Sequence, residues 1–443
     1  MFGEVITMAN IKIDNSKTIG KIKPMHAVGQ APVGGLGKKF FQSFHYLTEA
    51  GVPVSRLHDV GGPFGSNRFV DVPNIFRDFG ADENDPASYD FTFTDALITS
   101  LIEAGVEPYY RLGITIENQA AIKAYHTEPP KDFHKWARVC EHIIAHYNEG
   151  WADGFHYNIR YWEIWNEPDG DTEIRGYPQM WHGSAELYFE LYDITSRHLK
   201  ARFPEIKVGG YAACGIQAAF FTEEEKEKYP LQVDWLNFFY KFIEFLKEKK
   251  PTIDFFSWHG YQTVHKMLQR AEWISERLKE SGYGNIEIHL NEWNPAPDKR
   301  CTGEHGANVE AMMLAMQNSD VDMCMFYDAR LQGSVYAGLF HPMTLTPTQA
   351  YYSLVAFNEL YKLGNQAELV VEADTKSLFA VAATDGKKNA IVVSNISGAP
   401  QELNFEGIDL SEARYHVIDD QRLLSWSPEV KVINNNTVVL IEY

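Results

Sequence analysis

The chain has 443 residues, of which 45% are hydrophobic and 14% aromatic, enough apolar material for a large folded core. Its formal net charge of −20 argues against nucleic acid and favours a neutral ligand, because phosphate binding relies on lysine and arginine. The four cysteines form no CxxC pair and no run of about 18 apolar residues occurs, so neither a zinc site nor a membrane span is predicted.

Short apolar runs alternate with longer amphipathic segments up to residue 363. Several runs are apolar throughout, which is typical of parallel strands buried on both faces. Eight such strand–helix repeats predict an α/β fold, a (β/α)8 TIM barrel over residues 16–363. An open doubly wound sheet is the alternative, but no GxGxxG follows the first strand. The predicted strands are Ile22–Val28, Val52–Leu57, Glu107–Leu112, Arg160–Trp165, Ile206–Gly210, Phe255–Trp258, Ile286–Leu290 and Met323–Tyr327.

Two helices of this region have clear sequence signals. Asp234–Lys250 carries an apolar stripe with helical spacing. Thr346 and Pro347 resemble an N-cap followed by proline at the first helical position, so we expect the last helix to begin there.

The C-terminal part of the chain has a different sequence pattern. Its short β-branched and aromatic runs predict strands, and Asp385-Gly386 between two of them predicts a hairpin. Glu4–Ile13 alternates like a strand and is expected to join them. The sequence therefore predicts a small accessory antiparallel β-sandwich from residues 1–15 plus 364–443. Its predicted strands include Leu378–Thr384, Ala390–Asn395, Tyr415–Ile418 and Thr437–Tyr443.

Two glutamates follow barrel strands in similar contexts. Glu167 lies in Trp165-Asn166-Glu167-Pro168 after the fourth strand, and Glu292 lies in Asn291-Glu292-Trp293 after the seventh. Barrel enzymes carry their catalytic groups at the C-terminal ends of the strands, so these two carboxylates can face each other across one mouth. Alternation along a strand places Glu292 on the same face as Ile288 and Leu290.

The same alternation places Glu163 on the face of Glu167, but four residues deeper. We expect substrate not to reach Glu163 and expect an interior arginine, Arg56 or Arg111, to hold it. Paired carboxylates across a cavity are what glycoside hydrolysis requires. The apolar residues around Glu167 would favour its protonated form, which can donate a proton. Glu292 needs hydrogen bonds and a cation to stay ionised, and Arg56 is the predicted cation.

On these residues the chain resembles clan A glycoside hydrolases, and among them glycoside hydrolase family 39. Tyr161–Pro168 resembles the family's acid/base motif and Leu290–Asn294 its nucleophile motif. The resemblance extends over roughly residues 20–345 and includes Arg56-Leu57-His58, Lys207–Gly210 and Ser257–Tyr261. It implies a retaining mechanism without metal or cofactor, with carboxyl groups about 5–5.5 Å apart. It also implies that Glu167 is the acid/base, Glu292 is the nucleophile, Asn166 contacts the sugar 2-hydroxyl, and His58, His259 and Tyr261 line the subsite of the cleaved sugar.

The segment after the eighth strand departs from the family pattern. The family usually has Trp-Thr-Phe-Ser-Asp followed by an acidic pair, whereas this chain has Cys324–Asp328 followed by Leu331 and Gln332. Loss of these sugar contacts is expected to change or weaken specificity for xylose. Arg330 would suit an acidic sugar. We expect Trp293 and Tyr327 to stack on sugar, Trp165 to lie in the core, and the long loop His58–Asp90 to wall the pocket. The positions of Trp181 and Trp258 stay open.

The predicted function is a retaining, exo-acting glycoside hydrolase that releases a terminal neutral sugar, nearest to β-xylosidase, from an oligosaccharide or glycoside. Alternatives are β-galactosidase, α-L-arabinopyranosidase or iduronidase-like activity, and a carbohydrate-binding barrel with weak turnover. No cofactor, metal, nucleic acid or membrane partner is expected, and a homo-oligomer is possible. The N-terminus shows no signal peptide, which suits a cytoplasmic protein, or a periplasmic or secreted one whose signal was removed.

Overall fold

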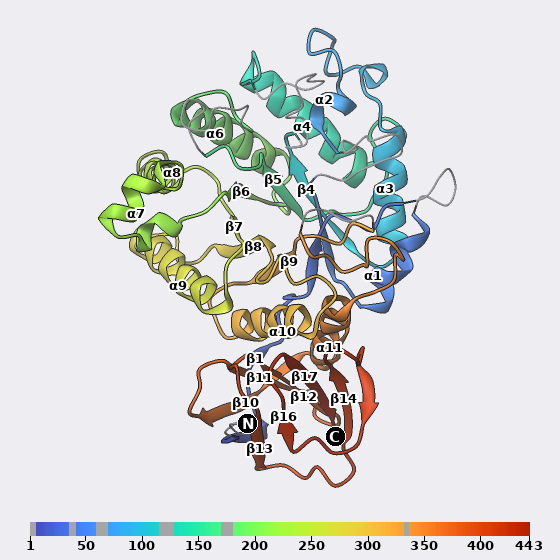
Figure 1. Cartoon of the computed structure of the whole chain (residues 1–443). Helices are drawn as coiled ribbons and strands as arrows, with labels where there is room; N and C mark the ends of the chain where they lie inside the picture. Colours follow the sequence, from blue (N-terminus) through green and yellow to red (C-terminus); the bar gives the residue numbers. More distant parts are fainter. Residues whose placement is uncertain (1–5, 35–40, 59–69, 115–127, 170–179, 332–335) are drawn as a thin grey trace.

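Eight parallel strands close into a barrel surrounded by helices (Figure 1). The computed structural model describes residues 6–34, 41–58, 70–114, 128–169, 180–331 and 336–443. Each predicted barrel strand is present, which confirms the predicted fold class, although the first strand is shorter and later than expected. The barrel strands are β2 (Ala27–Gly29), β3 (Val54–Leu57), β4 (Glu107–Leu112), β5 (Tyr161–Ile164), β6 (Lys207–Ala213), β7 (Phe255–Gly260), β8 (Glu287–Trp293) and β9 (Met323–Phe326).

Helices on the outside of the barrel bury the outward-facing residues of these strands. The described helices are α1 (His45–Glu49), α2 (Val72–Ile75), α3 (Thr92–Glu103), α4 (Phe133–Asn148), α6 (Ala185–Arg202), α7 (Glu223–Lys228), α8 (Pro230–Lys249), α9 (Val264–Glu280), α10 (Gly303–Gln317) and α11 (Gln349–Leu363). The predicted helix around Asp234–Lys250 is α8, which begins earlier than expected. The start predicted for the last helix was wrong: α11 begins at Gln349, after Thr348, and Pro347 instead pairs with Phe340 in an isolated β-bridge.

A layer of aromatic rings fills the lower part of the barrel. Tyr109 and Tyr161 stack with ring centroids 5.3 Å apart, and Phe255 stacks on His289 at 4.7 Å. Tyr109, Tyr161 and Phe255 stand near the N-terminal ends of their strands and form one buried cluster with Val54 and others. These rings close the lower end of the barrel. The polar side chains inside the barrel therefore lie at the C-terminal ends of the strands.

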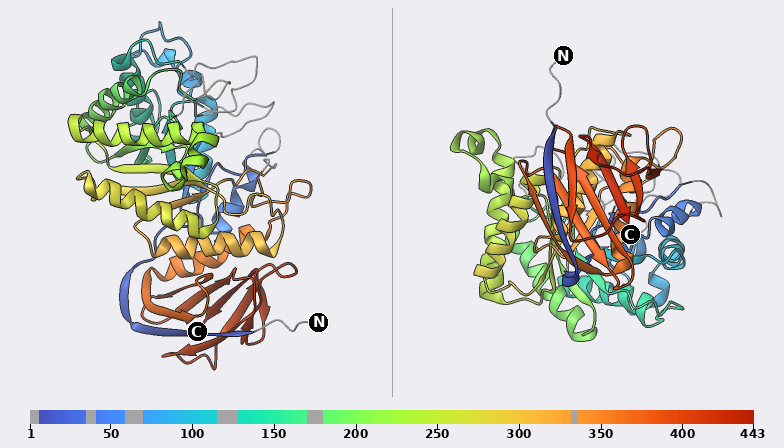
Figure 2. Two further views of the ribbon diagram at one scale, coloured as in Figure 1. Left: turned by 60° about the vertical axis from the view of Figure 1, so that its left-hand side comes forward. Right: turned by 90° about the horizontal axis from the view of Figure 1, so that it is seen from below.

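The remaining strands form one sheet that curls beneath the barrel (Figure 2). Hydrogen bonds run through nine strands in the order β15-β14-β17-β12-β11-β10-β1-β13-β16. One face encloses a separate apolar core, and the other packs on α10 and α11. The strands are β1 (Thr7–Lys21), β10 (Asn365–Ala373), β11 (Leu378–Thr384), β12 (Asn389–Asn395), β13 (Gln401–Glu406), β14 (Arg414–Ile418), β15 (Ser425–Ser427), β16 (Val432–Ile433) and β17 (Thr437–Glu442).

The N-terminal strand joins this sheet, as the sequence predicts, between β10 and β13. It pairs with β10 as far as Lys21 opposite Asn365, beyond the predicted domain boundary at residue 15, while Glu4 lies outside the described residues. The division of the chain into two domains stays a prediction. The hairpin expected at Asp385-Gly386 is confirmed, because β11 and β12 pair on both sides of it. Within the described ranges, no helix has the length and apolar character needed to cross a membrane.

Candidate active site

Glu167 is presented by a distorted chain segment directly after β5. Trp165 and Glu167 both have positive φ angles, 72° and 47°, a conformation that costs about 1–3 kcal/mol per residue. Neighbouring strands hold the segment in place: Trp165 N donates to the carbonyl of Leu112 at 2.7 Å and Glu167 N to that of Ala212 at 3.1 Å. The Trp165 ring packs outward against Trp136 and is buried, which confirms its predicted place in the core.

Glu292 reaches the barrel mouth through a bulge in β8. Trp258 pairs with Leu290, but the next residue, His259, pairs with Glu292, so Asn291 is an extra residue. The predicted alternation was therefore wrong. Leu290 packs between barrel and helices, whereas His289 and Asn291 point into the barrel.

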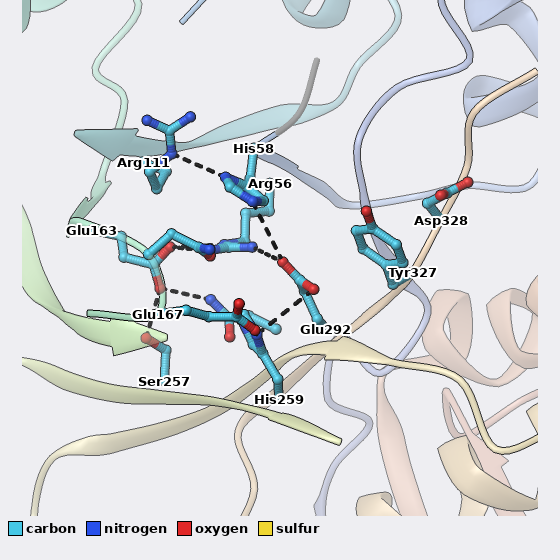
Figure 3. Close-up of polar contacts among 12 residues, drawn as sticks. Arg56, His58, Arg111, Glu163, Glu167, Ser257, His259, Glu292, Tyr327 and Asp328 are labelled. Atoms are coloured by element: carbon cyan, nitrogen blue, oxygen red, sulfur yellow. Dashed lines mark hydrogen bonds and ion pairs between the residues drawn. The ribbon is translucent and has the colours of Figure 1, made fainter. Parts of the chain in front are cut away.

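Arg56 lies at the centre of the polar groups in the barrel mouth (Figure 3). Its Nε donates to Glu163 Oε2 at 2.7 Å, its Nη1 to Glu292 Oε1 at 2.8 Å, and its Nη2 to Asn166 Oδ1 at 2.6 Å. Burial lowers the pKa of Arg56, but the charges of Glu163 and Glu292 outweigh burial and raise it, so Arg56 stays cationic. The geometry agrees with the predicted pairing of Arg56 with Glu163 and of Arg56 with Glu292.

Glu163 is fully buried below the mouth and saturated with hydrogen bonds. Besides Arg56, the Ser257 hydroxyl donates to its Oε1 at 2.6 Å and Asn291 Nδ2 donates to the same oxygen at 2.6 Å. Ser257 and Asn291 were not predicted as part of the site. Their small polar side chains in apolar strands were the available signal.

The two glutamates face each other at close range. One carboxylate oxygen of Glu167 and one of Glu292 lie within 4.8 Å, which fits the roughly 5–5.5 Å separation of retaining glycosidases and not the roughly 6.5–9.5 Å of inverting ones. Burial raises the pKa of Glu292, while His259, Arg56 and the hydroxyl of Tyr261, which donates to Oε2 at 2.8 Å, act in the opposite direction. The hydrogen bonds and cation expected around Glu292 are present, but burial dominates its pKa.

His58 approaches the same carboxylate from the end of β3. Its Nε2 lies 4.0 Å from Glu292 Oε1, and its Nδ1 accepts a hydrogen bond from Arg111 Nε at 3.1 Å. Arg111 also forms a buried ion pair with Asp71 Oδ1 at 2.6 Å, so Arg111 does not hold Glu163. Burial and the two nearby arginines lower the pKa of His58 well below its ordinary value, which keeps the imidazole neutral. The role of Asp71 was missed because it lies within the predicted long loop His58–Asp90, which has no strand signal.

Of the predicted stacking residues, the structure brings Tyr327 to the mouth and removes Trp293 from it. The Tyr327 and Tyr261 rings meet edge to face at 6.0 Å, and both also contact Tyr336. Trp293 is 0% exposed and packs against Phe326, because it follows the inward-facing Glu292 and so points to the core side of β8. We therefore withdraw the sugar-stacking role of Trp293. The open positions of Trp181 and Trp258 are also resolved, since both are buried in the core.

In the segment after β9, Arg330 binds two neighbouring side chains of the same segment. Arg330 donates through Nε and Nη2 to Asp328 Oδ2, at 3.0 and 2.8 Å, and through Nη2 to the Tyr327 hydroxyl at 3.3 Å. Because Asp328 is 1% exposed and neutralises Arg330, these contacts do not favour an acidic sugar at this position.

A separate cavity of about 600 Å³ lies outside the ends of β4 and β5, lined mostly by apolar side chains that include Phe76, Phe79, Trp136 and Trp165. Part of the long loop predicted to wall a pocket, residues 72–80, forms one side of this cavity, whereas residues 59–69 lie outside the described residues. Neither Glu167 nor Glu292 is among its described lining residues.

His259 lies between the two glutamates. Its Nδ1 is 2.7 Å from Glu167 Oε1 and 3.6 Å from Glu292 Oε2. A proton on this nitrogen would form the hydrogen bond to Glu167, and acid–base chemistry without a metal stays a prediction.

Comparison with known proteins places the chain in a family. The model of the glycosyl hydrolases family 39 matches residues 11–322. The chain belongs to this family. A β-xylosidase of Geobacillus stearothermophilus is 24% identical over 258 residues, which span 52% of this chain and 46% of that relative, so the match covers less than half the length of the relative.

Solved structures share the fold of the family 39 chain over nearly its whole length. A glucosidase from Croceicoccus marinus has a TM-score of 0.75 at 18% identity, with 98% of both chains covered. A family 39 β-xylosidase from Caulobacter crescentus has a TM-score of 0.69 at 19% identity and covers 98% of this chain and 99% of its own. At these identities the likeness supports the barrel with its attached sheet.

Proposed function

We propose that this family 39 chain is a retaining, exo-acting glycoside hydrolase that releases a terminal neutral sugar, nearest to β-xylosidase, through a covalent glycosyl-enzyme intermediate. The observation that carries the proposal is the approach of Glu167 and Glu292 to within 4.8 Å across the barrel mouth. The family 39 match and the similarity to named β-xylosidases support the sugar assignment.

In this mechanism the two carboxyl groups have different tasks. Glu292 attacks the anomeric carbon while Glu167 protonates the departing oxygen, and Glu167 then activates water to hydrolyse the glycosyl ester. Arg56 and Tyr261 each bind one oxygen of Glu292 and fix its orientation. Asn166 Nδ2 has no hydrogen-bond partner among the described residues, so it is available for the hydroxyl next to the anomeric carbon.

The alternative sugars draw no specific support from the site. An iduronidase-like activity would need a cation free to bind the sugar carboxylate, and Arg330 is paired with Asp328. β-Galactosidase and α-L-arabinopyranosidase activities differ from β-xylosidase activity in sugar hydroxyl contacts, so a panel of aryl glycosides distinguishes them.

The deciding experiment replaces the nucleophile. Glu292→Ala should abolish hydrolysis of every aryl glycoside that the wild type cleaves, while circular dichroism stays unchanged. Added azide, which can enter the space left by the carboxylate, should restore cleavage and give a glycosyl azide of inverted configuration. Glu304→Ala, at a partly exposed glutamate of α10, is the matched control and should keep full activity.

Stereochemistry provides the second measurement. Proton NMR of the first-formed sugar should show the same anomeric configuration as the substrate. Full activity of Glu292→Ala, or release of the inverted anomer by the wild type, would refute the mechanism. Binding of glycosides without any turnover would favour the carbohydrate-binding alternative.

A further inference from the structure

The position of His259 suggests a function beyond lining the sugar site. The ring stands near the end of β7, and Nδ1 faces both carboxylates, 2.7 Å from Glu167 Oε1 and 3.6 Å from Glu292 Oε2 (Figure 3). Its other nitrogen, Nε2, is buried and has no hydrogen-bond partner in the described part of the chain. All polar contacts of the ring that the structure shows therefore go to the two groups that carry the chemistry.

The charges around the ring favour a proton on it. Glu167 and Glu292 supply two carboxylates, the cation Arg56 opposes them, and the nearby imidazole of His58 is neutral. Tyr261, a further titratable group close by, stays neutral because burial raises its pKa well above its ordinary value. Burial lowers the pKa of His259, but the charge of Glu292 and the hydrogen bond to Glu167 outweigh it and raise the pKa.

We propose that His259 is a positioning residue that stores the catalytic proton and passes it to Glu167 when a glycoside binds. The inference rests on the proposed function and deepens it. Glu167 makes the contact with the leaving oxygen, and His259 acts only through Glu167, along the 2.7 Å hydrogen bond.

The proton balance closes over one turnover. In the resting enzyme Glu292 is ionised and one proton is shared between His259 Nδ1 and Glu167 Oε1. During the first step this proton moves onto Glu167 and then to the glycosidic oxygen as its bond to the anomeric carbon breaks and Glu292 bonds to that carbon. The products are the free alcohol, a glycosyl ester on Glu292, ionised Glu167 and neutral His259.

In the second step Glu167 takes a proton from water as the water oxygen attacks the anomeric carbon, and the ester bond to Glu292 breaks. Glu292 regains its charge, which again favours a proton on His259. While the ester exists this charge is absent, so the proton is not held on the imidazole when Glu167 has to act as a base. The charge of Glu292 thus sets when His259 holds the proton.

Substrates that differ in leaving group test the proposal. His259→Gln keeps a side-chain N–H donor but removes the titratable proton. With an alkyl glycoside, whose leaving oxygen needs a proton, kcat/KM should fall about 10²-fold or more. With a dinitrophenyl glycoside of the same sugar, whose leaving group departs as a stable anion, kcat/KM should fall far less. Glu167→Gln is the benchmark and should show the same selective loss.

The ratio of the two kcat/KM values does not depend on how much of the variant is folded, so a folding defect cannot imitate the result. The alkaline limb of the alkyl glycoside profile should also move to lower pH in His259→Gln, because Glu167 alone then holds the proton. An equal loss on both substrates, or an unmoved alkaline limb, would overturn the inference and leave the proposed function intact. A wild type that cleaves no glycoside would overturn both.

Discussion

Glu310 is a buried carboxyl group whose replacement should stabilise the protein. It lies in α10, the helix between the barrel and the curled sheet, and is 0% exposed. Neither of its oxygens has a hydrogen-bond partner among the described residues. Burial therefore raises the pKa of Glu310 well above its ordinary value, and the group is neutral in the folded protein at pH values where the unfolded chain has ionised it.

The sign of the effect follows from proton binding. Above the ordinary pKa of a glutamate the folded state holds one more proton than the unfolded state, so the free energy of unfolding falls as pH rises. The slope approaches about 1.4 kcal/mol per pH unit until the pH reaches the raised pKa. A rise of about two pH units that stays below the raised pKa should thus cost the wild type roughly 2–3 kcal/mol relative to a variant without the charge.

Glu310→Gln provides that variant, because it keeps the shape of the side chain and cannot ionise. Urea unfolding of both proteins should give a stability difference in favour of the variant that grows with pH. Glu304→Gln, on the same helix and partly exposed, is the matched control and should follow the wild type. A difference that stays constant with pH, or a variant that loses stability as pH rises, would refute the argument.

Two further predictions concern the groups that bind Glu292. Tyr261→Phe removes the hydrogen bond that lowers the pKa of Glu292, so the acidic limb of kcat/KM should move to higher pH in a pH–rate profile, and an unmoved limb would contradict this contact. Arg56→Lys keeps the positive charge but loses the guanidinium group that binds Glu163, Glu292 and Asn166. We therefore expect kcat/KM to fall by about 10²-fold or more. Activity near that of the wild type would show that the positive charge alone suffices.

The barrel could be predicted from the sequence because its strands are short apolar runs separated by amphipathic helices, a pattern with few structural solutions. The exact ends of the strands and helices were harder to predict from the sequence. The residues from Ile22 onward look like a strand, but only Ala27–Gly29 pairs in the barrel, while β1 continues to Lys21 in the sheet. Thr346 and Pro347 carry the signal of a helix start, yet tertiary pairing of Pro347 with Phe340 delays the helix.

The bulge in β8 explains why the contact of Asn291 was missed. Strict alternation assigns Glu292 to the same face as Leu290, and no residue type in this stretch of β8 indicates that Asn291 is an extra residue in the strand. The bulge turns Asn291 inward to Glu163, so one missed backbone feature accounts for this missed contact. Trp293 follows the inward-facing Glu292, so alternation itself places Trp293 on the core side, and the expected stacking role did not take this into account.

Glu163 shows why the chain keeps a carboxylate where no substrate reaches it. A buried ion pair is weak evidence for stability, since desolvation offsets its attraction, so its retention needs another reason. Glu163 fixes the Nε edge of Arg56, and Ser257 and Asn291 in turn fix Glu163. The guanidinium can then offer Nη1 to Glu292 in only one direction. The orientation of the Glu292 carboxylate thus depends on the buried polar residues below it, Glu163, Ser257 and Asn291. Strand alternation predicted only Glu163 among them.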